Sequence, residues 1–583
     1  MENKPNIEHI RHSLAHLLAA AVLKEFPDAK LGIGPVIENG FYYDFELSRS
    51  LTPDDLKTFE KTMRGLINKK LPFTGEEIPF TEAKKRFAKQ PFKLDLINEF
   101  SAEGKTLTIY HTGDVFSDLC RGGHVENTSE IPADTFKLDK IAGAYWRGDE
   151  KNPMLQRIYG LAFATKQELD DYLAMRIEAE KRDHKILGKK LGLFTFSPDV
   201  GPGLPLYMPK GNIIRETLLE YMRELKRAHG YQFVWTPHLT KKALYIRSGH
   251  FGKYDAMLPP IDADGEELAI KPMNCPHHFQ IFNAEPHSYK DMPFRIAENA
   301  TVYRNEKSGE LNGLFRVRSL TQDDSHLIVR HDQIASEIDT ILDLTHQIYD
   351  LFGFKNFKVE ISVRDKANKE KYFGTDQMWD DAEHALIEAA KRWGAEYRIV
   401  EGEAAFYGPK IDIRVEDALK RNWQLTTVQL DYNQPENFDM SYIDENGKKV
   451  RPAVIHCAIL GSVDRFMGII IEHFAGAFPL WLAPVQVAVL PVGEKFSAYG
   501  KSIYETLMAH DVRSELGDAN ESLGKRIRAV EMMKVPYVIV VGEKEEAAGT
   551  VNFRTRDSEE KSNEMKLDEF IDKVEKEIKE KKR

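Results

Sequence analysis

Histidine and cysteine occur early in the chain at spacings typical of metal ligands or catalytic groups. His12 and His16 are four residues apart in a stretch with helical periodicity, so both side chains should project from one face of a helix. Cys120 and His124 have the same spacing much further along the chain. By spacing alone, these four side chains could bind a zinc ion. The alternative is a structural helix with two histidines on its surface.

Four polar segments in the middle of the chain form a second group of candidates. They span residues 273–277, 302–318, 322–326 and 456–466. Arg304, Arg316 and Arg465 lie in these segments. Arginine binds phosphate well, because its planar guanidinium forms paired hydrogen bonds and keeps its proton. A single arginine more often forms a surface ion pair, so the interpretation depends on the segments occurring together.

Composition excludes several classes of protein. The three cysteines, Cys120, Cys275 and Cys457, argue against a disulfide framework, so each thiol is a candidate ligand or catalytic group. No apolar run approaches the ~20 residues of a membrane helix. The polar first ten residues lack the apolar core of a signal peptide, so we expect a cytoplasmic protein with no membrane partner. The net charge of −11 argues against general coating of nucleic acid but permits local basic patches.

The elements that must position these residues follow from periodicity and turn residues. A chain of 583 residues can form roughly three to four domains. We expect a helix over 7–25, and strands that include 358–363, 410–415 and 424–430. Gly, Pro and Asn turns separate these strands, which favours an antiparallel sheet flanked by helices. The charged, proline-free stretch 166–190 predicts a connecting helix.

Taken in order, the four polar segments resemble the signature motifs of class II aminoacyl-tRNA synthetases. The loop bracketed by Arg304 and Arg316 is similar to motif 2, and the segment that contains Arg465 is similar to motif 3. A long helix ending near Gly230, followed by a strand over 233–237, resembles motif 1, which builds the dimer interface in this class. Within the class, the chain resembles the threonyl-tRNA synthetases over essentially its whole length.

This resemblance implies an α+β multidomain protein. Its expected parts are an α+β editing domain (1–165), a linker helix (166–190), a class II catalytic domain with an antiparallel sheet flanked by helices (191–484), and an α/β anticodon-binding domain (485–583). Many relatives carry a ubiquitin-like domain before the editing domain, and we expect this chain to represent the form without it. The implied activity is ATP-dependent ligation of L-threonine to tRNA(Thr) by a homodimer.

The resemblance assigns the arginines to ATP. Threonine activation is attack of a carboxylate on the α-phosphate, so charge builds on phosphoryl oxygens and the site needs fixed cations and Mg²⁺. Arg304 is expected to hold the α-phosphate and the carboxylate, and Arg465 to stack on adenine and reach the γ-phosphate. Glu306 should bind the adenine amino group, and Arg316 should hold the bent triphosphate.

The resemblance also implies one zinc ion per subunit, bound by Cys275, His326 and His456. Such a site keeps an open position, so a substrate amine and hydroxyl can both bind, and valine loses a ligand. A site built around a polar group can reject an analogue without it by ~10⁴-fold. The other residues expected near threonine or the terminal ribose are Met273, Asp324, Tyr407, Lys410, Gln424, Ser462, Gln322 and His250.

His12, His16, Cys120 and His124 then resemble the editing site that hydrolyses mischarged seryl-tRNA(Thr). Serine is the expected error, because it keeps the hydroxyl that zinc selects. In the threonine branch this site works without a metal, and Lys93 and Asp118 are expected to support it. In the last domain, the expected anticodon contacts are Asn520, Arg528, Glu545 and Arg554, since amide, guanidinium and carboxylate groups can bind splayed-out bases.

The chain departs from the family pattern at three positions, and two other functions stay open. Gly123 and Cys457 stand where the family commonly has proline and arginine, and Asp464 replaces a usual glutamate. Cys457 should point away from the zinc, because neighbouring side chains on a strand face opposite ways. The alternatives are an inactive paralogue that binds tRNA-like RNA and a zinc hydrolase. The retained motif arginines argue against the first, and the absence of a His-Glu-x-x-His helix argues against the second.

Overall fold

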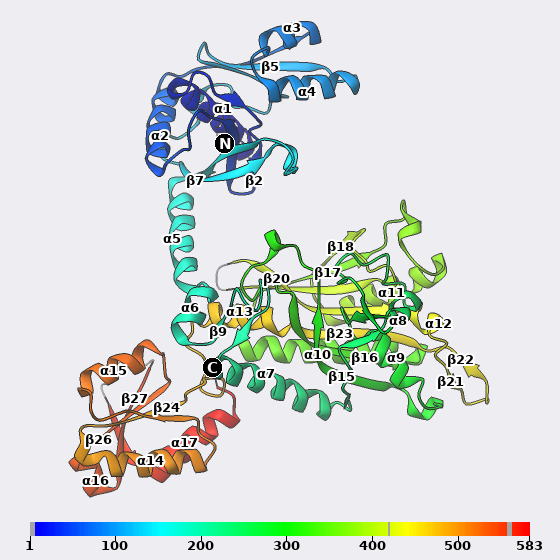
Figure 1. Ribbon diagram of the computed structural model, residues 1–583, viewed down its shortest axis with the longest axis vertical. Coiled ribbons are helices and arrows are strands. Elements are labelled where there is room, and N and C mark those ends of the chain that lie inside the picture. Colours follow the sequence, from blue (N-terminus) through cyan, green and yellow to red (C-terminus); the bar gives the residue numbers. More distant parts are fainter. Residues whose placement is uncertain (1–5, 418–419, 557–561, 583) are drawn as a thin grey trace. The chain divides into compact units, whose positions relative to one another are not determined.

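The computed structural model describes residues 6–417, 420–556 and 562–582 (Figure 1). The chain divides into two compact units, Met1–Ile177 and Glu178–Arg583. The boundaries predicted at 165, 190 and 484 are finer than this division and stay predictions. In the described ranges, no helix has the length and apolar character that a membrane crossing requires.

Two antiparallel sheets, four α-helices and the first part of α5 (Lys166–Arg182) are the main elements of the described part of the first unit. The larger, five-stranded sheet has the order β1-β3-β8-β7, with β2 also paired to β3, and the smaller sheet has the order β4-β5-β6. The strands are β1 (Lys30–Leu31), β2 (Val36–Ile37), β3 (Gly40–Glu46), β4 (Phe73–Ile78), β5 (Leu107–Thr112), β6 (Phe116–Leu119), β7 (Phe136–Tyr145) and β8 (Met154–Ala162). The helices are α1 (Ile7–Glu25), α2 (Pro53–Asn68), α3 (Phe80–Arg86) and α4 (Pro91–Ala102).

Helix α1 is the central element of this unit. It begins after Asn6, whose side chain accepts a hydrogen bond from the Glu8 amide and so satisfies one free donor of the first turn. Its residues from Ser13 to Val22 are buried without a break, so the helix is enclosed on most sides. The predicted helix over 7–25 is confirmed, and its burial fixes the direction of His12 and His16.

The predicted connecting helix over 166–190 is wrong as a single element. Two helices occupy this stretch, α5 (Lys166–Arg182) and α6 (His184–Leu191). They are separated at Asp183, whose carboxylate accepts a hydrogen bond from the Lys185 amide at 2.7 Å and thereby caps α6. The chain can therefore turn between α5 and α6.

An eight-stranded sheet forms the core of the second unit as described. Its order is β11-β15-β16-β23-β20-β19-β17-β18, antiparallel except for the parallel pairs β11/β15 and β17/β18 at the two edges. The strands are β11 (Gln232–Phe233), β15 (Phe294–Tyr303), β16 (Ser319–Val329), β17 (Phe357–Val363), β18 (Tyr397–Glu401), β19 (Lys410–Glu416), β20 (Asn422–Asp431) and β23 (Ala453–Ser462). The predicted antiparallel sheet is thus confirmed.

Helices cover this sheet, and short hairpins extend from it. Helices α10 and α13 pack against β16, β20 and β23, and together they form the largest apolar core (Figure 1). The helices are α7 (Pro209–Ala228), α8 (Lys242–Arg247), α9 (Cys275–Phe282), α10 (Ile334–Phe352), α11 (Asp376–Trp393), α12 (Gln434–Asn437) and α13 (Val463–His473). The remaining strands are β9 (Phe194–Thr195), β10 (Leu206–Tyr207), β12 (Leu239–Lys241), β13 (Ile261–Ala263), β14 (Glu266–Ile270), β21 (Tyr442–Ile443) and β22 (Lys449–Val450).

The strand predicted over 233–237 is shorter than expected. Helix α7 is followed by β11, which ends at Phe233 and is extended by one further backbone bond, from the Val234 amide to the Ala297 carbonyl. The amide and hydroxyl of Thr236 then bond to the Glu298 carboxylate instead of a strand partner. Pro237 has no N–H to donate, so the ladder cannot continue there.

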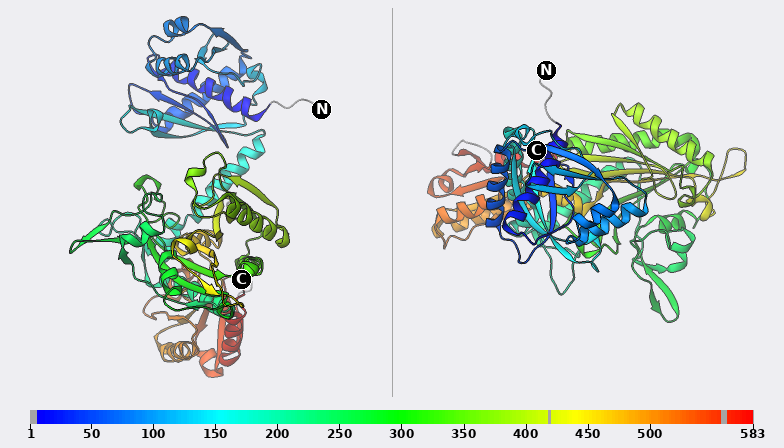
Figure 2. Two further views of the ribbon diagram at one scale, coloured as in Figure 1. Left: turned by 90° about the vertical axis from the view of Figure 1, so that its right-hand side faces the viewer. Right: turned by 90° about the horizontal axis from the view of Figure 1, so that it is seen from above.

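The C-terminal part of the second unit contains a mixed sheet. Its order is β25-β24-β26-β27-β28, with β24 parallel to β25 and to β26. Its elements are β24 (Val487–Pro491), α14 (Ser497–Ala509), β25 (Ser514–Leu516), α15 (Leu523–Met532), β26 (Tyr537–Val541), α16 (Glu543–Ala548), β27 (Thr550–Thr555), β28 (Asn563–Lys566) and α17 (Leu567–Lys579). Helices α14 and α17 share a core with these strands, drawn in orange and red in Figure 2.

Candidate functional site

One cavity of about 740 Å³ lies over the middle strands of the large sheet. All the residues predicted to bind ATP, threonine, zinc or the terminal ribose line it: His250, Met273, Cys275, Arg304, Glu306, Arg316, Gln322, Asp324, His326, Tyr407, Lys410, Gln424, His456, Ser462 and Arg465. The folded chain therefore collects residues from β16, β19, β20, β23, α9, α13 and the loops between elements at a single place. The roles that the resemblance gives to these side chains stay predictions.

Cys275, His326 and His456 converge at one end of this cavity. Each offers one ligand atom, and these atoms lie within 4.8 Å of one another. Cys275 is the first residue of α9, while His326 and His456 are direct partners in the β16/β23 ladder. Nε2 of His326 lies 3.0 Å from Nδ1 of His456, so the two rings present nitrogens to the same point.

The other nitrogen of each histidine has its own partner. Nδ1 of His326 lies 2.8 Å from Nδ1 of His278, and Nε2 of His456 lies 2.9 Å from the Asp431 carboxylate. Such partners fix the orientation of imidazole ligands and raise their basicity. His278 and Asp431 were not singled out from the sequence. Asp431 comes directly after the predicted strand over 424–430. An acidic residue at the end of a strand that carries pocket residues was a signal that could have identified it as part of the site.

Burial sets the protonation of these groups. It raises the pKa of the Cys275 thiol well above its usual value and lowers the pKa of His326 well below its usual value. The imidazole is therefore neutral and ready to donate a lone pair, whereas the thiol needs a bound cation to lose its proton. One thiol and two imidazoles form a donor set suited to zinc.

Cys457 lies on the other face of β23. Since successive side chains on a strand point to opposite faces, His456 faces the ligand group and Cys457 faces away from it. Burial raises the pKa of this thiol well above its usual value. Among the charged groups that act on it, Lys226 comes first, and it forms an ion pair with Asp323. Cys457 is therefore not part of the group formed by Cys275, His326 and His456.

Three arginines, Arg304, Arg316 and Arg465, also come together in this cavity. Burial lowers the pKa of Arg465, and the nearby charges of Arg304 and Arg316 lower it further. Nε of Arg304 is buried without a hydrogen-bond partner among the described residues. The Arg316 guanidinium lies 2.7 Å from Glu306. Cations held close together against their mutual repulsion make a site for a polyanion.

The loop that carries Arg316 is anchored by a histidine from α6. The Leu314 amide donates to Nε2 of His184 at 3.0 Å, and Nδ1 of His184 lies 2.7 Å from the Glu472 carboxylate at the end of α13. The ring also packs on Phe315, with centroids 4.1 Å apart. Asp183, His184 and Glu472 are close enough to hold a metal, but Glu472 is also paired with Arg421 and both ring nitrogens are occupied. This group is therefore a hydrogen-bonded anchor.

The threonine side of the cavity is supported by a polar network. Asp324 accepts a hydrogen bond from the Asn274 amide group at 3.0 Å, and the Tyr407 hydroxyl donates to Gln429 at 2.8 Å. Asp412, a buried residue of β19, accepts hydrogen bonds from Lys410 and Gln424. These contacts hold the predicted pocket residues at fixed positions.

His250 is buried against this network. Its Nδ1 lies 2.8 Å from the Ser248 hydroxyl, and its Nε2 is buried with no partner among the described residues. Burial lowers the pKa of His250 to about 3, so the ring is neutral near pH 7. The unpartnered nitrogen is available to a bound molecule.

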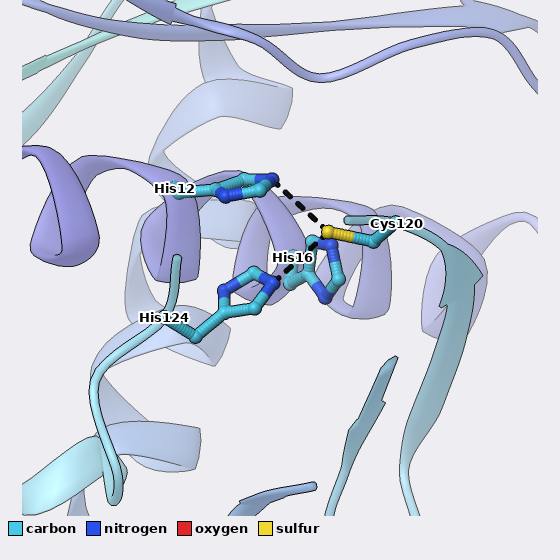
Figure 3. A group of neighbouring side chains, drawn as sticks. All are labelled: His12, His16, Cys120 and His124. Carbon is cyan, nitrogen blue, oxygen red and sulfur yellow. Dashed lines mark hydrogen bonds between the residues drawn. The ribbon is translucent and has the colours of Figure 1, made fainter. Parts of the chain in front are cut away.

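In the first unit, His12, His16, Cys120 and His124 also come together (Figure 3). The two histidines of α1 face the segment that follows β6. Sγ of Cys120 lies 3.4 Å from Nε2 of His12 and 3.2 Å from Nε2 of His124. Burial lowers the pKa of all three histidines and raises that of Cys120 to about 11, so the four groups are uncharged near pH 7.

A buried polar triad lies beside this cluster. Lys93 and Asp118 form an ion pair at 2.6 Å, and the Tyr43 hydroxyl bonds to both residues. Tyr43, on β3, was missed by sequence reasoning, because an aromatic residue in a predicted strand is more often part of the core. Its hydroxyl completes the hydrogen bonding of the ion pair.

Gly123 has a conformation that proline cannot adopt. Its φ is +83° and that of Gly122 is +91°, whereas proline is fixed near −65°. The loop that carries His124 therefore follows a path here that the proline common in the family would prevent.

The four anticodon candidates lie on the helices, strands and loops of the C-terminal part. Asn520, Arg528 and Arg554 are exposed, on the loop before α15, on α15 and on β27. Glu545 differs, because it is buried and its carboxylate accepts a hydrogen bond from the Gly542 amide at 2.9 Å. In this arrangement Glu545 caps the start of α16.

Comparison with known families agrees with this geometry. Residues 257–474 match the tRNA synthetase class II core domain (G, H, P, S and T), and residues 486–577 match an anticodon binding domain. Residues 107–159 match the threonyl and alanyl tRNA synthetase second additional domain, and they include Cys120 and His124.

Individual relatives cover nearly the whole chain. A threonine–tRNA ligase of Gloeobacter violaceus is 48% identical over 95% of this chain and 90% of its own, and one of Rubrobacter xylanophilus is 46% identical over 98% and 88%. Among solved structures, the RNA binding domain of threonyl-tRNA synthetase from Cryptosporidium parvum has a TM-score of 0.65 at 36% identity, covering 68% of this chain and 98% of that chain. A prolyl-tRNA synthetase of Giardia lamblia, at 16% identity and a TM-score of 0.54, covers 70% of this chain and 81% of its own and shares the fold alone.

The antiparallel sheet, the convergent arginines and the matched core domain define a class II aminoacyl-tRNA synthetase. This class was predicted from the four polar segments, and the prediction is confirmed. The identity and coverage of the relatives narrow the class further: the chain belongs to the threonine–tRNA ligase family.

Proposed function

We propose that this chain joins L-threonine to tRNA(Thr) in two steps within the large cavity. In the first step, the threonine carboxylate attacks the α-phosphorus of ATP, and pyrophosphate leaves. In the second, a terminal ribose hydroxyl of the tRNA attacks the carbonyl of the adenylate, and AMP leaves. The observation that carries the proposal is that the three-ligand group and the three arginines line the same cavity.

The arginines act on the triphosphate. Arg304 would bridge the α-phosphate and the attacking carboxylate, and its Nε, which has no hydrogen-bond partner among the described residues, supports this role. Arg316 and Arg465 hold the remaining phosphates together with Mg²⁺. Because all three cations are fixed before the substrate binds, little reorganisation is needed as charge builds on the phosphoryl oxygens.

Cys275, His326 and His456 would hold one zinc ion per subunit. When bound, zinc supplies a Lewis-acidic position for the substrate amine and hydroxyl, which valine cannot fill. His278 and Asp431 orient the two imidazoles through their second nitrogens. Asp324, fixed by Asn274, accepts the proton of the substrate hydroxyl. His250 is neutral, so its free Nε2 offers a hydrogen bond to the terminal ribose.

The first unit would hydrolyse seryl-tRNA(Thr) without a metal. Neutral imidazoles of His12 and His124 can position a water molecule, and the buried pair of Lys93 and Asp118 would support the site. The Cys120 thiol stays protonated near neutral pH, since its pKa is raised to about 11, so it serves as a hydrogen-bonding group and not as a nucleophile.

The active form would be a homodimer formed through the motif 1 region. Apolar side chains are exposed around α7, where Met208 is 42% and Trp235 is 75% accessible in the single chain. Exposed apolar patches of this kind mark protein interfaces. Light scattering should give twice the 66.8 kDa chain mass.

Two assays test the proposed function. Aminoacylation should yield threonyl-tRNA(Thr) with wild-type protein, and preformed seryl-tRNA(Thr) should be hydrolysed. The double variant His12→Ala/His16→Ala should lose the hydrolysis and keep the aminoacylation. If that variant still deacylates seryl-tRNA(Thr) at the parent rate, the editing assignment is wrong.

A further inference from the structure

A buried lysine lies behind the strands that carry the predicted zinc ligands. Lys226 extends inward from α7 and is 2% exposed. Its ammonium donates to the backbone carbonyl of Asp323 and lies 3.3 Å from a carboxylate oxygen of the same residue. A lysine is rarely buried unless it is paired, so this contact needs a reason.

Asp323 in turn holds a bulged segment of β23. Its carboxylate is fully buried and accepts hydrogen bonds from the amides of Ile459 at 2.9 Å and Leu460 at 3.0 Å. The β16/β23 register shifts at this point, since Gln322 pairs with Ser462 while Asp324 pairs with Ala458. The side chain of Asp323 therefore replaces ladder bonds that the bulge removes.

The residues on both sides of Asp323 line the cavity. Since strand side chains alternate, Gln322 and Asp324 face the threonine pocket while Asp323 faces Lys226. The bulged segment leads directly to Ser462, another predicted pocket residue. A change in the position of Asp323 would move groups on two strands of the site.

Cys457 lies on the same face as Asp323, next to this pair. It is opposite Ser325 in the ladder, and the Ser325 hydroxyl is buried with no partner among the described residues. The charges of Lys226 and Asp323 both act on the Cys457 thiol. An arginine at position 457, which the family commonly has, would point into the region that Lys226 fills here from another element.

We propose that Lys226 is a positioning residue for threonine activation: it supplies, from α7, the buried positive charge that fixes Asp323 and, through Asp323, the pocket groups of β16 and β23. The inference rests on the proposed function for its activity readout. The proposal also predicts that a positive charge at position 457 can replace the charge of Lys226 and keep the pocket active, because both positions face the Asp323 carboxylate.

Removing the charge alone is the first arm of the test. Lys226→Met keeps most of the side-chain length, so the variant leaves Asp323 buried and unpaired. We expect kcat/KM for threonine-dependent pyrophosphate exchange to fall by at least about tenfold, because breaking one side of a buried pair is costly. Bound zinc should stay at the parent level. If the pyrophosphate-exchange rate of Lys226→Met is unchanged, the proposal is wrong. It is also wrong if the variant loses its zinc and that loss explains the lower rate.

Moving the charge is the second arm. Lys226→Ala/Cys457→Arg should regain at least about tenfold in kcat/KM over Lys226→Ala. The matched control, Lys226→Ala/Cys457→Leu, fills the space without a charge and should not recover. Cys457→Arg with Lys226 still present should be harmful, since two cations would compete for one carboxylate. Equal recovery by leucine would show that Lys226 acts by packing, and the proposal would fail.

Thermal unfolding without substrates separates this inference from the proposed function. The midpoint should fall in Lys226→Ala, recover in the arginine swap and stay low in the leucine control. This order is expected whatever reaction the cavity performs. If the parent protein shows no threonine-dependent pyrophosphate exchange, the proposed function fails. The order of the unfolding midpoints then still tests whether the charge of Lys226 stabilises the buried Asp323. Any other order would contradict the inference.

Discussion

Cys275 and Cys457 are both buried thiols beside the same histidines, yet they face different parts of the protein. Cys275 begins α9 and its sulfur lies with His326 and His456, whereas Cys457 faces Lys226 behind the sheet. Alternation along a strand was enough to predict this difference from the sequence. The supporting contacts of His278 and Asp431 depend on tertiary packing, so the sequence alone did not reveal them.

Cys275→Ala should abolish zinc binding and lower threonine-dependent pyrophosphate exchange by at least about a hundredfold, because only two ligands remain. Metal content of the purified protein and the exchange rate are the two measurements. Cys457→Ala is the matched control and should keep the parent zinc content. If Cys457→Ala loses zinc while Cys275→Ala retains it, Cys457 and not Cys275 is the ligand.

Cys120 should react slowly with iodoacetamide at neutral pH. Its pKa is raised to about 11, so at pH 7 only about one thiol in ten thousand is the reactive thiolate. Since the thiolate fraction grows tenfold per pH unit below the pKa, the alkylation rate should rise in the same way between pH 7 and pH 10. Peptide mapping by mass spectrometry can follow the site. Rapid, pH-independent alkylation at pH 7 would show that the thiol is already ionised.

At the scale of elements, helix α6 is tied to the loop that carries Arg316. His184 accepts a hydrogen bond from the Leu314 amide and is paired with Glu472 at the end of α13. The sequence predicted one helix across this region, because no proline or glycine interrupts it before Gly188. The break at Asp183 depends on a side-chain cap and on the burial of His184, which composition does not reveal.

His184→Phe should raise the KM for ATP by roughly tenfold and leave the KM for threonine nearly unchanged. The phenyl ring can still pack on Phe315, but it cannot accept from the Leu314 amide, so the loop loses its anchor. His184→Gln, which keeps a donor and an acceptor, should stay close to the parent. Initial rates of pyrophosphate exchange at varied ATP and threonine provide both constants. An equal rise in both KM values would indicate a general structural defect.

At the scale of the whole molecule, residues from six separate elements and from the loops between them line one cavity, and all of these residues were predicted from the sequence. This was possible because motif residues keep their order along the chain. Periodicity also predicted α1 and the strands β17, β19 and β20. It did not predict the length of β11, which depends on Glu298, or the buried triad of Tyr43, Lys93 and Asp118.

The central claim is that one cavity activates threonine and selects it through a metal that senses its hydroxyl. Amino-acid-dependent exchange of pyrophosphate into ATP tests this claim most directly, with the zinc-loaded protein and threonine, serine or valine as substrate. The proposed geometry predicts strong exchange with threonine, weaker exchange with serine, and exchange with valine lower than with threonine by about 10⁴-fold. Absence of threonine-dependent exchange, or comparable rates with valine and threonine, would contradict the claim.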